Sequence, residues 1–131
     1  MKIQMKEGLP FVPATVVFRG RGGTLANMLL DTGSAGTLLS ADRLLDIGVQ
    51  FEPADPVRRI RGVGGAEFVF VKRVEHIAVG ELMAGDFSIE VGAMDYGFEL
   101  DGIIGNDFLV QVGAVIDLAK FEIKAAPSAP R

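Results

Sequence analysis

The chain of 131 residues has no cysteine, one histidine and no long hydrophobic run, and each absence removes a class of protein. Without cysteine there is no disulfide framework and no thiol chemistry, which suits a cytoplasmic protein or a soluble domain of a longer or anchored one. The single histidine, His76, leaves a histidine-rich metal site without ligands. No apolar run approaches ~20 residues and no leader-like segment is visible, so we expect no membrane segment.

Basic clusters are also missing. Lys and Arg number 13 against 17 Asp and Glu, which gives a net charge of −4. Nucleic-acid binding needs concentrated positive charge, so we expect no nucleic-acid partner. What the chain does have is glycine, 17 residues in all, with short β-branched and aromatic runs between the glycines. This pattern predicts one all-β domain.

Alternating apolar runs bounded by turn residues locate the expected strands. We expect strands at residues 11–19, 24–30, 37–39, 57–60, 68–71, 74–79, 82–84, 87–91, 114–118 and 121–124. Ser40 is a candidate cap for a brief helix at 41–46 that ends before Gly48. We assign residues 10–124 to the domain, residues 1–9 to a segment that is loose or forms a dimer strand, and residues 125–131 to a disordered tail.

Three segments carry the functional signal. Residues 29–35 read Leu-Leu-Asp-Thr-Gly-Ser-Ala, so a carboxylate, Asp31, arrives from a buried strand and the backbone then turns. Residues 101–109 place two isoleucines before Gly105 and a short helix. Between them, residues 60–66 read Ile-Arg-Gly-Val-Gly-Gly-Ala and predict a hairpin with a glycine-rich tip. Burying an acid is costly unless hydrogen bonds or a partner compensate it, so Asp31 is the first candidate for chemistry.

The first of these segments is similar to the active-site signature of aspartic proteases. The order of all three resembles the retropepsin-like family, the retroviral-type single-domain branch that also has cellular and bacterial members. The resemblance covers most of residues 11–118. It implies an all-β acid-protease fold, a closed barrel with one or two short helices and a flap hairpin. It also implies an aspartic endopeptidase that cuts peptide or protein substrates and needs no metal or organic cofactor.

The implied chemistry requires two carboxylates facing one water molecule and sharing a proton. This chain carries one Asp-Thr-Gly and nothing repeats it. Asp95, Asp101 and Asp107 lack that context, so the second Asp31 would come from another copy. The resemblance therefore implies a homodimer with two-fold symmetry.

The resemblance also assigns roles by position. The implied catalytic residues are Asp31, Thr32 and Gly33, and the implied substrate-binding residues are Leu29, Ser34, Ala35, Val63, Gly64, Gly65 and Ile103. Thr32 would direct its hydroxyl to the partner loop, and Gly33 would let the substrate backbone approach. Ser34 would hydrogen-bond the carboxylate, and the glycine-rich tip would close over an extended peptide. Apolar pocket positions imply a preference for hydrophobic side chains at the cut.

Some positions depart from the retroviral pattern. Ala35, Gly36 and Asn106 stand where retroviral members usually carry charges that support the dimer. The C-terminal hairpin, with Val115 and Ile123, is a candidate for a different dimer sheet.

Simpler interpretations stay open beside the enzyme. The Asp-Thr-Gly segment also fits a tight turn after a strand, and the isoleucine pair fits a buried strand end. Arg58, Arg59 and Arg61 fit a solvated face, and His76 fits a structural role. Among functions, the alternative to the protease is a dimer that binds peptides without cutting them, followed by a purely structural domain.

Overall fold

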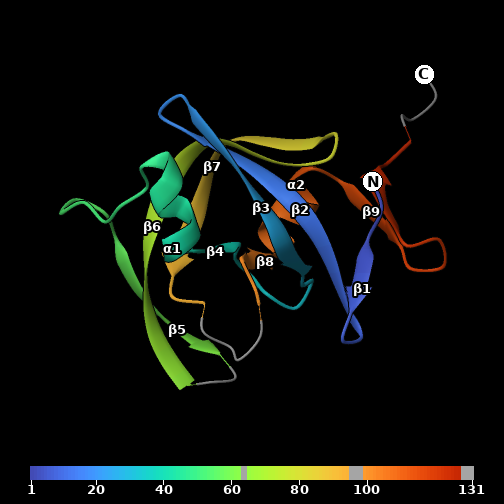
Figure 1. The fold of residues 1–131 in the computed structure, drawn as a ribbon, viewed down its shortest axis with the longest axis horizontal. Coiled ribbons are helices and arrows are strands. Elements are labelled where there is room, and N and C mark those ends of the chain that lie inside the picture. The colour runs from blue at the N-terminus through green and yellow to red at the C-terminus, as the bar shows by residue number, and fades with distance from the viewer. Residues whose placement is uncertain (63–64, 95–98, 128–131) are drawn as a thin grey trace.

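A computed structural model describes residues 1–62, 65–94 and 99–127 of the chain. The fold is all-β, with a ring-like sheet and short helices, as the sequence predicts (Figure 1). Its strands are β1 (Gln4–Lys6), β2 (Leu9–Phe18), β3 (Arg21–Leu30), β4 (Leu38–Ser40), β5 (Val57–Gly62), β6 (Gly65–Val79), β7 (Leu82–Gly92), β8 (Gly102–Ile104), β9 (Ala114–Asp117) and β10 (Glu122–Ala125). Its helices are α1 (Ala41–Leu44), the single 3₁₀ turn η1 (Leu45–Ile47) and α2 (Asn106–Gln111). Within the described ranges, no helix has both the length and the apolar character needed to cross a membrane.

The main sheet has the strand order β1-β2-β3-β8-β4-β7-β6-β5, and a further pairing of β2 with β6 closes the ring. That closure runs from Thr15 opposite Ala78 to Val17 opposite His76. Side chains alternate in and out along the longer strands, as in β2, where Val12, Ala14, Val16 and Phe18 enter the core. The most deeply buried apolar residues include Val16, Met28, Leu39, Ile77, Ile89, Val91, Ile104 and Phe108.

Local sequence explains the helix after β4. The Ser40 hydroxyl accepts a hydrogen bond from the Arg43 N–H at 3.5 Å, which confirms the predicted cap. The turn ends at Gly48, whose φ of 82° lies in the left-handed region that favours glycine. The predicted helix is confirmed in position, but only Ala41–Leu44 is α-helical and the last turn is 3₁₀.

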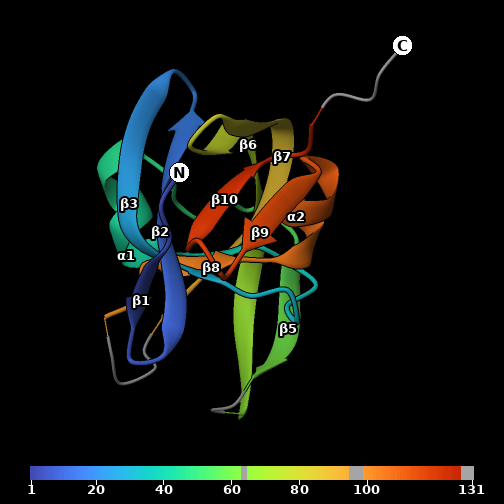
Figure 2. The ribbon, with the colours of Figure 1, turned by 90° about the vertical axis from the view of Figure 1, so that its right-hand side faces the viewer.

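The two ends of the chain pair with each other inside one subunit (Figure 2). Strands β9 and β10 form the predicted last hairpin, with Ile123 opposite Ile116. The Ile3 N–H donates to the carbonyl of Phe121 at 2.8 Å, and the Ile123 N–H donates to the carbonyl of Met1 at 2.9 Å. Ile3 and Ile123 are buried, so this terminal sheet is part of the hydrophobic core.

Candidate active site

Asp31 lies directly after β3, where a buried strand gives way to an exposed loop (Figure 1). Strand β3 pairs in parallel with β8, which places Leu30 beside Ile104. The backbone N–H of Asp31 continues the ladder by donating to the carbonyl of Ile104 at 3.0 Å. Two segments about seventy positions apart in the sequence therefore meet at this acid, in the arrangement that the three motifs predict.

Backbone N–H groups of the loop itself hold Asp31 in place. The Gly33 N–H donates to Asp31 Oδ1 at 3.0 Å, and the Ser34 N–H donates to the Asp31 carbonyl at 3.1 Å. Asp31 is half-buried, whereas Thr32, Gly33 and Ala35 are exposed. The acid is thus fixed by backbone donors at a surface that other molecules can reach.

Ser34 differs from its expected role. Its hydroxyl donates to the carbonyl of Gly36 at 2.8 Å, which closes the loop on itself, and the structure gives it no bond to the Asp31 carboxylate. The Gly33 N–H supplies the donor that the sequence interpretation assigned to this side chain. A serine hydroxyl can donate to a nearby backbone carbonyl as readily as to a carboxylate, so sequence alone does not decide between the two acceptors.

The start of α2 anchors the same loop. The Asn106 N–H donates to the carbonyl of Ser34 at 2.7 Å. Gly105 is buried, and a Cβ at that position would collide with the backbone carbonyl of Gly36. Only glycine permits this close approach of two backbones, which explains the glycine that follows the isoleucine pair.

A polar cluster that sequence reasoning missed joins the end of the Asp31 loop to the start of α2. Thr37 is fully buried, and its hydroxyl donates to Asp107 Oδ1 at 2.7 Å. The same hydroxyl accepts from the Gly105 N–H at 3.0 Å. Asp107 was assigned only to a helix start, and nothing local in the sequence links it to a threonine seventy positions earlier.

Replacing Thr37 with Val should lower the free energy of unfolding by about 2 kcal/mol, because it leaves the buried Gly105 N–H without an acceptor and removes the hydroxyl donor from Asp107 Oδ1. Urea unfolding followed by circular dichroism measures this loss. Thr37→Ser keeps the hydroxyl and is the matched control, with an expected loss well under half as large. Equal losses for the two variants would assign the effect to packing of the methyl group instead.

The predicted pocket residues divide between described and undescribed parts of the chain. Leu29 and Ile103 are direct partners in the β3–β8 ladder and are half-buried, so they lie side by side next to the loop. Gly65 begins β6 and pairs with Gly62 at the end of the β5–β6 hairpin. That hairpin stands where the sequence predicts the flap, while Val63 and Gly64 lie outside the described residues.

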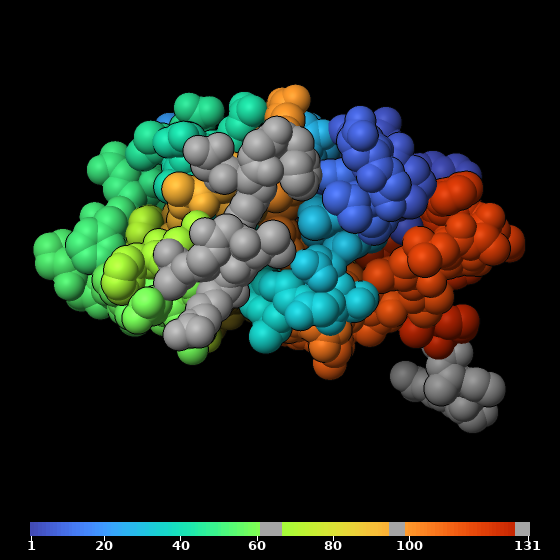
Figure 3. Space-filling view, turned by 90° about the horizontal axis from the view of Figure 1, so that it is seen from below, coloured from blue at the N-terminus to red at the C-terminus, as the bar shows by residue number. Residues whose placement is uncertain are grey.

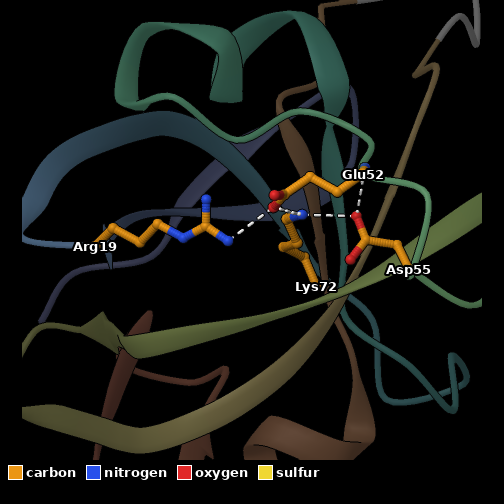
Figure 4. Close-up of polar contacts among 4 residues, drawn as sticks. All are labelled: Arg19, Glu52, Asp55 and Lys72. Atoms are coloured by element: carbon orange, nitrogen blue, oxygen red, sulfur yellow. Dashed lines mark hydrogen bonds and ion pairs between the residues drawn. The ribbon is translucent and has the colours of Figure 1, made fainter.

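A second charged cluster fixes the base of this hairpin (Figure 4). Lys72 of β6 is only 4% exposed, and its Nζ lies 2.6 Å from both Glu52 Oε1 and Asp55 Oδ2. Arg19 also reaches Glu52, at 2.7 Å. Asp55 lies in the segment that leads into β5, so the cluster ties this entry to β6. Sequence reasoning missed this cluster too, because its members are scattered along the chain.

The described residues include no group of three or more histidine, cysteine or acidic side chains arranged to hold a metal ion. The Asp31 carboxylate accepts a hydrogen bond from the Gly33 backbone N–H and lies next to the exposed residues Thr32 and Gly33. That arrangement suits chemistry in which a carboxylate exchanges protons with water.

Comparison with known proteins bears on the same residues. The chain matches the model of a family described as aspartyl protease over residues 12–108. This range holds Asp31, the β5–β6 hairpin and the Thr37–Asp107 contact. Comparison with curated proteins gives no match. Because the family match spans most of the chain and agrees with the ring-like sheet, the protein belongs to an aspartyl protease family of retropepsin-like type.

Proposed function

We propose that the protein is an aspartic endopeptidase that hydrolyses peptide bonds with a water molecule activated between the Asp31 carboxylates of two subunits. The observation that carries the proposal is the position of Asp31, half-buried after β3, next to the exposed residues Thr32 and Gly33. Membership of the aspartyl protease family supports the same chemistry.

The proposed reaction uses one carboxylate in each protonation state. Two acids held this close share a single proton, because both cannot ionise cheaply. The ionised Asp31 takes a proton from water, whose oxygen attacks the peptide carbonyl carbon. The protonated Asp31 donates to the carbonyl oxygen as negative charge develops there, and the proton gained from water then passes to the leaving nitrogen.

The need for a second subunit follows from the single Asp-Thr-Gly of the chain. The segment that joins β3 to β4 lies on an open face of the molecule (cyan in Figure 3). No hydrogen bond of the Thr32 hydroxyl is found within the part of the chain that the structure describes, and Thr32 is exposed. In the proposed dimer, the partner loop would accept a hydrogen bond from this hydroxyl.

The terminal sheet of β9 and β10 offers a surface for further dimer contacts. Among the described strands, β9 has β10 as its only partner, so one of its edges is open to a strand of the second subunit. Leu118 and Phe121 beside it are 58% and 46% exposed. Because Ile123 of β10 is core, point substitutions at Leu118 test this contact more cleanly than removal of the hairpin.

We assign substrate binding to the face of the molecule that carries both the Asp31 loop and the β5–β6 hairpin, which we call the flap hairpin. Its backbone would pair with an extended peptide as an added strand does. The half-buried Leu29 and Ile103 offer apolar contacts beside Asp31. The proposed preference is therefore for hydrophobic side chains on either side of the cut bond.

The test is digestion of a diverse peptide mixture, read by mass spectrometry from mildly acidic to neutral pH and over a range of protein concentrations. Specific activity should fall on dilution as dimers dissociate, because a lone subunit holds half of the proposed site. No cleavage by protein that sedimentation shows to be dimeric would contradict the proposal and favour the peptide-binding alternative.

Removing the Thr32 hydroxyl should weaken the dimer without weakening the subunit. We expect Thr32→Val to raise the protein concentration needed for half-maximal specific activity by about tenfold, the effect of roughly one lost buried hydrogen bond in each of two symmetric copies. Dilution series of activity and sedimentation measure this shift. Thr32→Ser keeps the donor and should stay near the wild type, and an unchanged dilution midpoint in Thr32→Val would remove Thr32 from the interface.

A further inference from the structure

Glu90 of β7 lies beside the catalytic loop although it is distant from it in sequence. Its backbone N–H donates to the carbonyl of Thr37 at 2.9 Å, and it pairs with Leu38 in the parallel β4–β7 ladder. Its carboxyl group occupies the space next to Gly36, where a Cβ would collide with Glu90 Oε1. The side chain therefore fills the position that a longer residue at 36 would take.

This carboxyl group is incompletely satisfied. Glu90 Oε2 is buried and has no hydrogen-bond partner among the described residues. Burial raises the pKa of Glu90, while Arg58 of β5 lowers it and Asp107 of α2 raises it. Glu90 as a whole is half-buried, but a buried carboxylate oxygen without a donor is costly, so this arrangement is explained best if a donor arrives in another state of the molecule.

The register of β5, β6 and β7 shows which hydrogen-bond donor lies on the same face of the sheet as Glu90. Directly paired residues, and residues two positions apart, point to the same face of a sheet. Glu90 pairs with Val71, and Arg58 pairs with Val69, two residues before Val71. Val69 also packs against Gly92, two residues after Glu90, with its Cγ1 2.8 Å from the site of a Cβ. Arg58 and Glu90 thus share one face, whereas Arg59 shares the opposite face with Phe68, which is 72% exposed.

We propose that Glu90 is a positioning residue that accepts the Arg58 guanidinium when the flap hairpin closes over a bound peptide. Closure would bring the cation of β5 onto the open carboxylate oxygen next to Gly36, which links the hairpin to the catalytic loop. This inference rests on the proposed protease function, because it assigns the contact to the peptide-bound state.

Ionisation of Glu90 then controls how firmly the hairpin closes. Neutral Glu90 attracts Arg58 weakly, and ionised Glu90 attracts it strongly. Burial, with a smaller contribution from Asp107, raises the pKa of Glu90, so this ionisation falls above the ordinary glutamate value of 4.5. We expect KM to fall by about fivefold as pH rises through this titration, as for a modest coupling between sites, and kcat of Glu90→Gln to match that of the wild type at each pH.

The kinetic test compares Glu90→Gln, Arg58→Gln, their double variant and the control Arg59→Gln on a peptide that the wild type cuts. Both single variants should raise KM at neutral pH by about fivefold, and the double variant should be no worse than either. Arg59→Gln should match the wild type. A fall in KM with pH that persists in Glu90→Gln, or additive losses in the double variant, would overturn the proposal.

A readout that needs no cleavage separates this proposal from the protease itself. With a peptide bound on the cleavage-inactive Asp31→Asn background, amide hydrogen exchange of β5 at neutral pH should become faster when Glu90→Gln or Arg58→Gln is added, and stay unchanged with Arg59→Gln. Glu90→Gln should at the same time unfold at a higher temperature near neutral pH. The reason is that the pKa of Glu90 is raised in the folded protein. The stability that its neutral form contributes is therefore fully present below pH 4.5 and is lost as pH rises through the raised pKa. If no form cuts any peptide, the proposed function fails, and unchanged exchange of β5 would separately overturn the contact.

Discussion

Replacing Asp31 with Asn is expected to lower peptide cleavage by on the order of 10³- to 10⁴-fold, because an amide cannot take a proton from water. The fold should be preserved. Asn has the same shape, and its Oδ1 can accept the Gly33 N–H that Asp31 Oδ1 accepts at 3.0 Å. Initial rates measured by mass spectrometry give the loss, and urea unfolding checks the fold. Cleavage by the purified variant at the wild-type rate would remove Asp31 from the mechanism.

The same variant also tests whether one site is built from two subunits. If dimers exchange freely, a threefold excess of Asp31→Asn protein leaves roughly a quarter of the wild-type subunits paired with each other. Activity should fall in that proportion, because a mixed dimer holds a single ionisable Asp31. The matched control is the double variant Asp31→Asn with Leu118→Asp, which should inhibit less if Leu118 lies in the interface. Undiminished activity at any excess would indicate a site complete within one chain.

Much of this fold is predictable because its strands obey a simple alternation. The hairpin predicted from the strands at 114–118 and 121–124 and the turn between the strands at 74–79 and 82–84 follow from apolar runs separated by turn residues, and the structure confirms both. The pairing of Leu30 with Ile104 does not follow from such an alternation. No local pattern dictates the parallel β3–β8 pairing, which was expected only through resemblance to a family.

The polar groups around the site show where sequence reasoning stops. Thr37 and Asp107 meet across seventy positions, and Glu90 reaches Gly36 from another strand. Each residue alone is compatible with an ordinary turn, helix start or strand, so its partner depends on register and on the twist of the ring. Ser34 illustrates the same limit at short range, since its hydroxyl had two acceptors within reach and the structure directs it to Gly36.

The Lys72 cluster should be a large contributor to stability, and its loss should weaken the base of the flap hairpin. Replacing Lys72 with Met keeps much of the side-chain volume but leaves Asp55 without its cation and Glu52 with Arg19 alone. Breaking a buried ion pair from one side costs about 3–5 kcal/mol, and we expect about 3 kcal/mol because the Glu52 side chain is 45% exposed and water screens it. Urea unfolding at neutral pH measures the loss, and Lys72→Arg, which keeps the charge, should lose less than half as much.

The pH dependence of that loss identifies its cause. Hydrogen bonds to Lys72 lower the pKa of Glu52 and of Asp55 below their ordinary values of 4.5 and 3.8. Burial alone lowers the pKa of Lys72, but its hydrogen bonds to Asp55 and Glu52 outweigh burial and raise it above 10.5. The cluster therefore stabilises the fold fully between about 4.5 and 10.5, and the carboxylate contribution disappears as pH falls through the lowered folded values. The deficit of Lys72→Met should shrink in acid, whereas a deficit of the same size at every pH would mean that Lys72 acts through packing against Phe18 and Phe70.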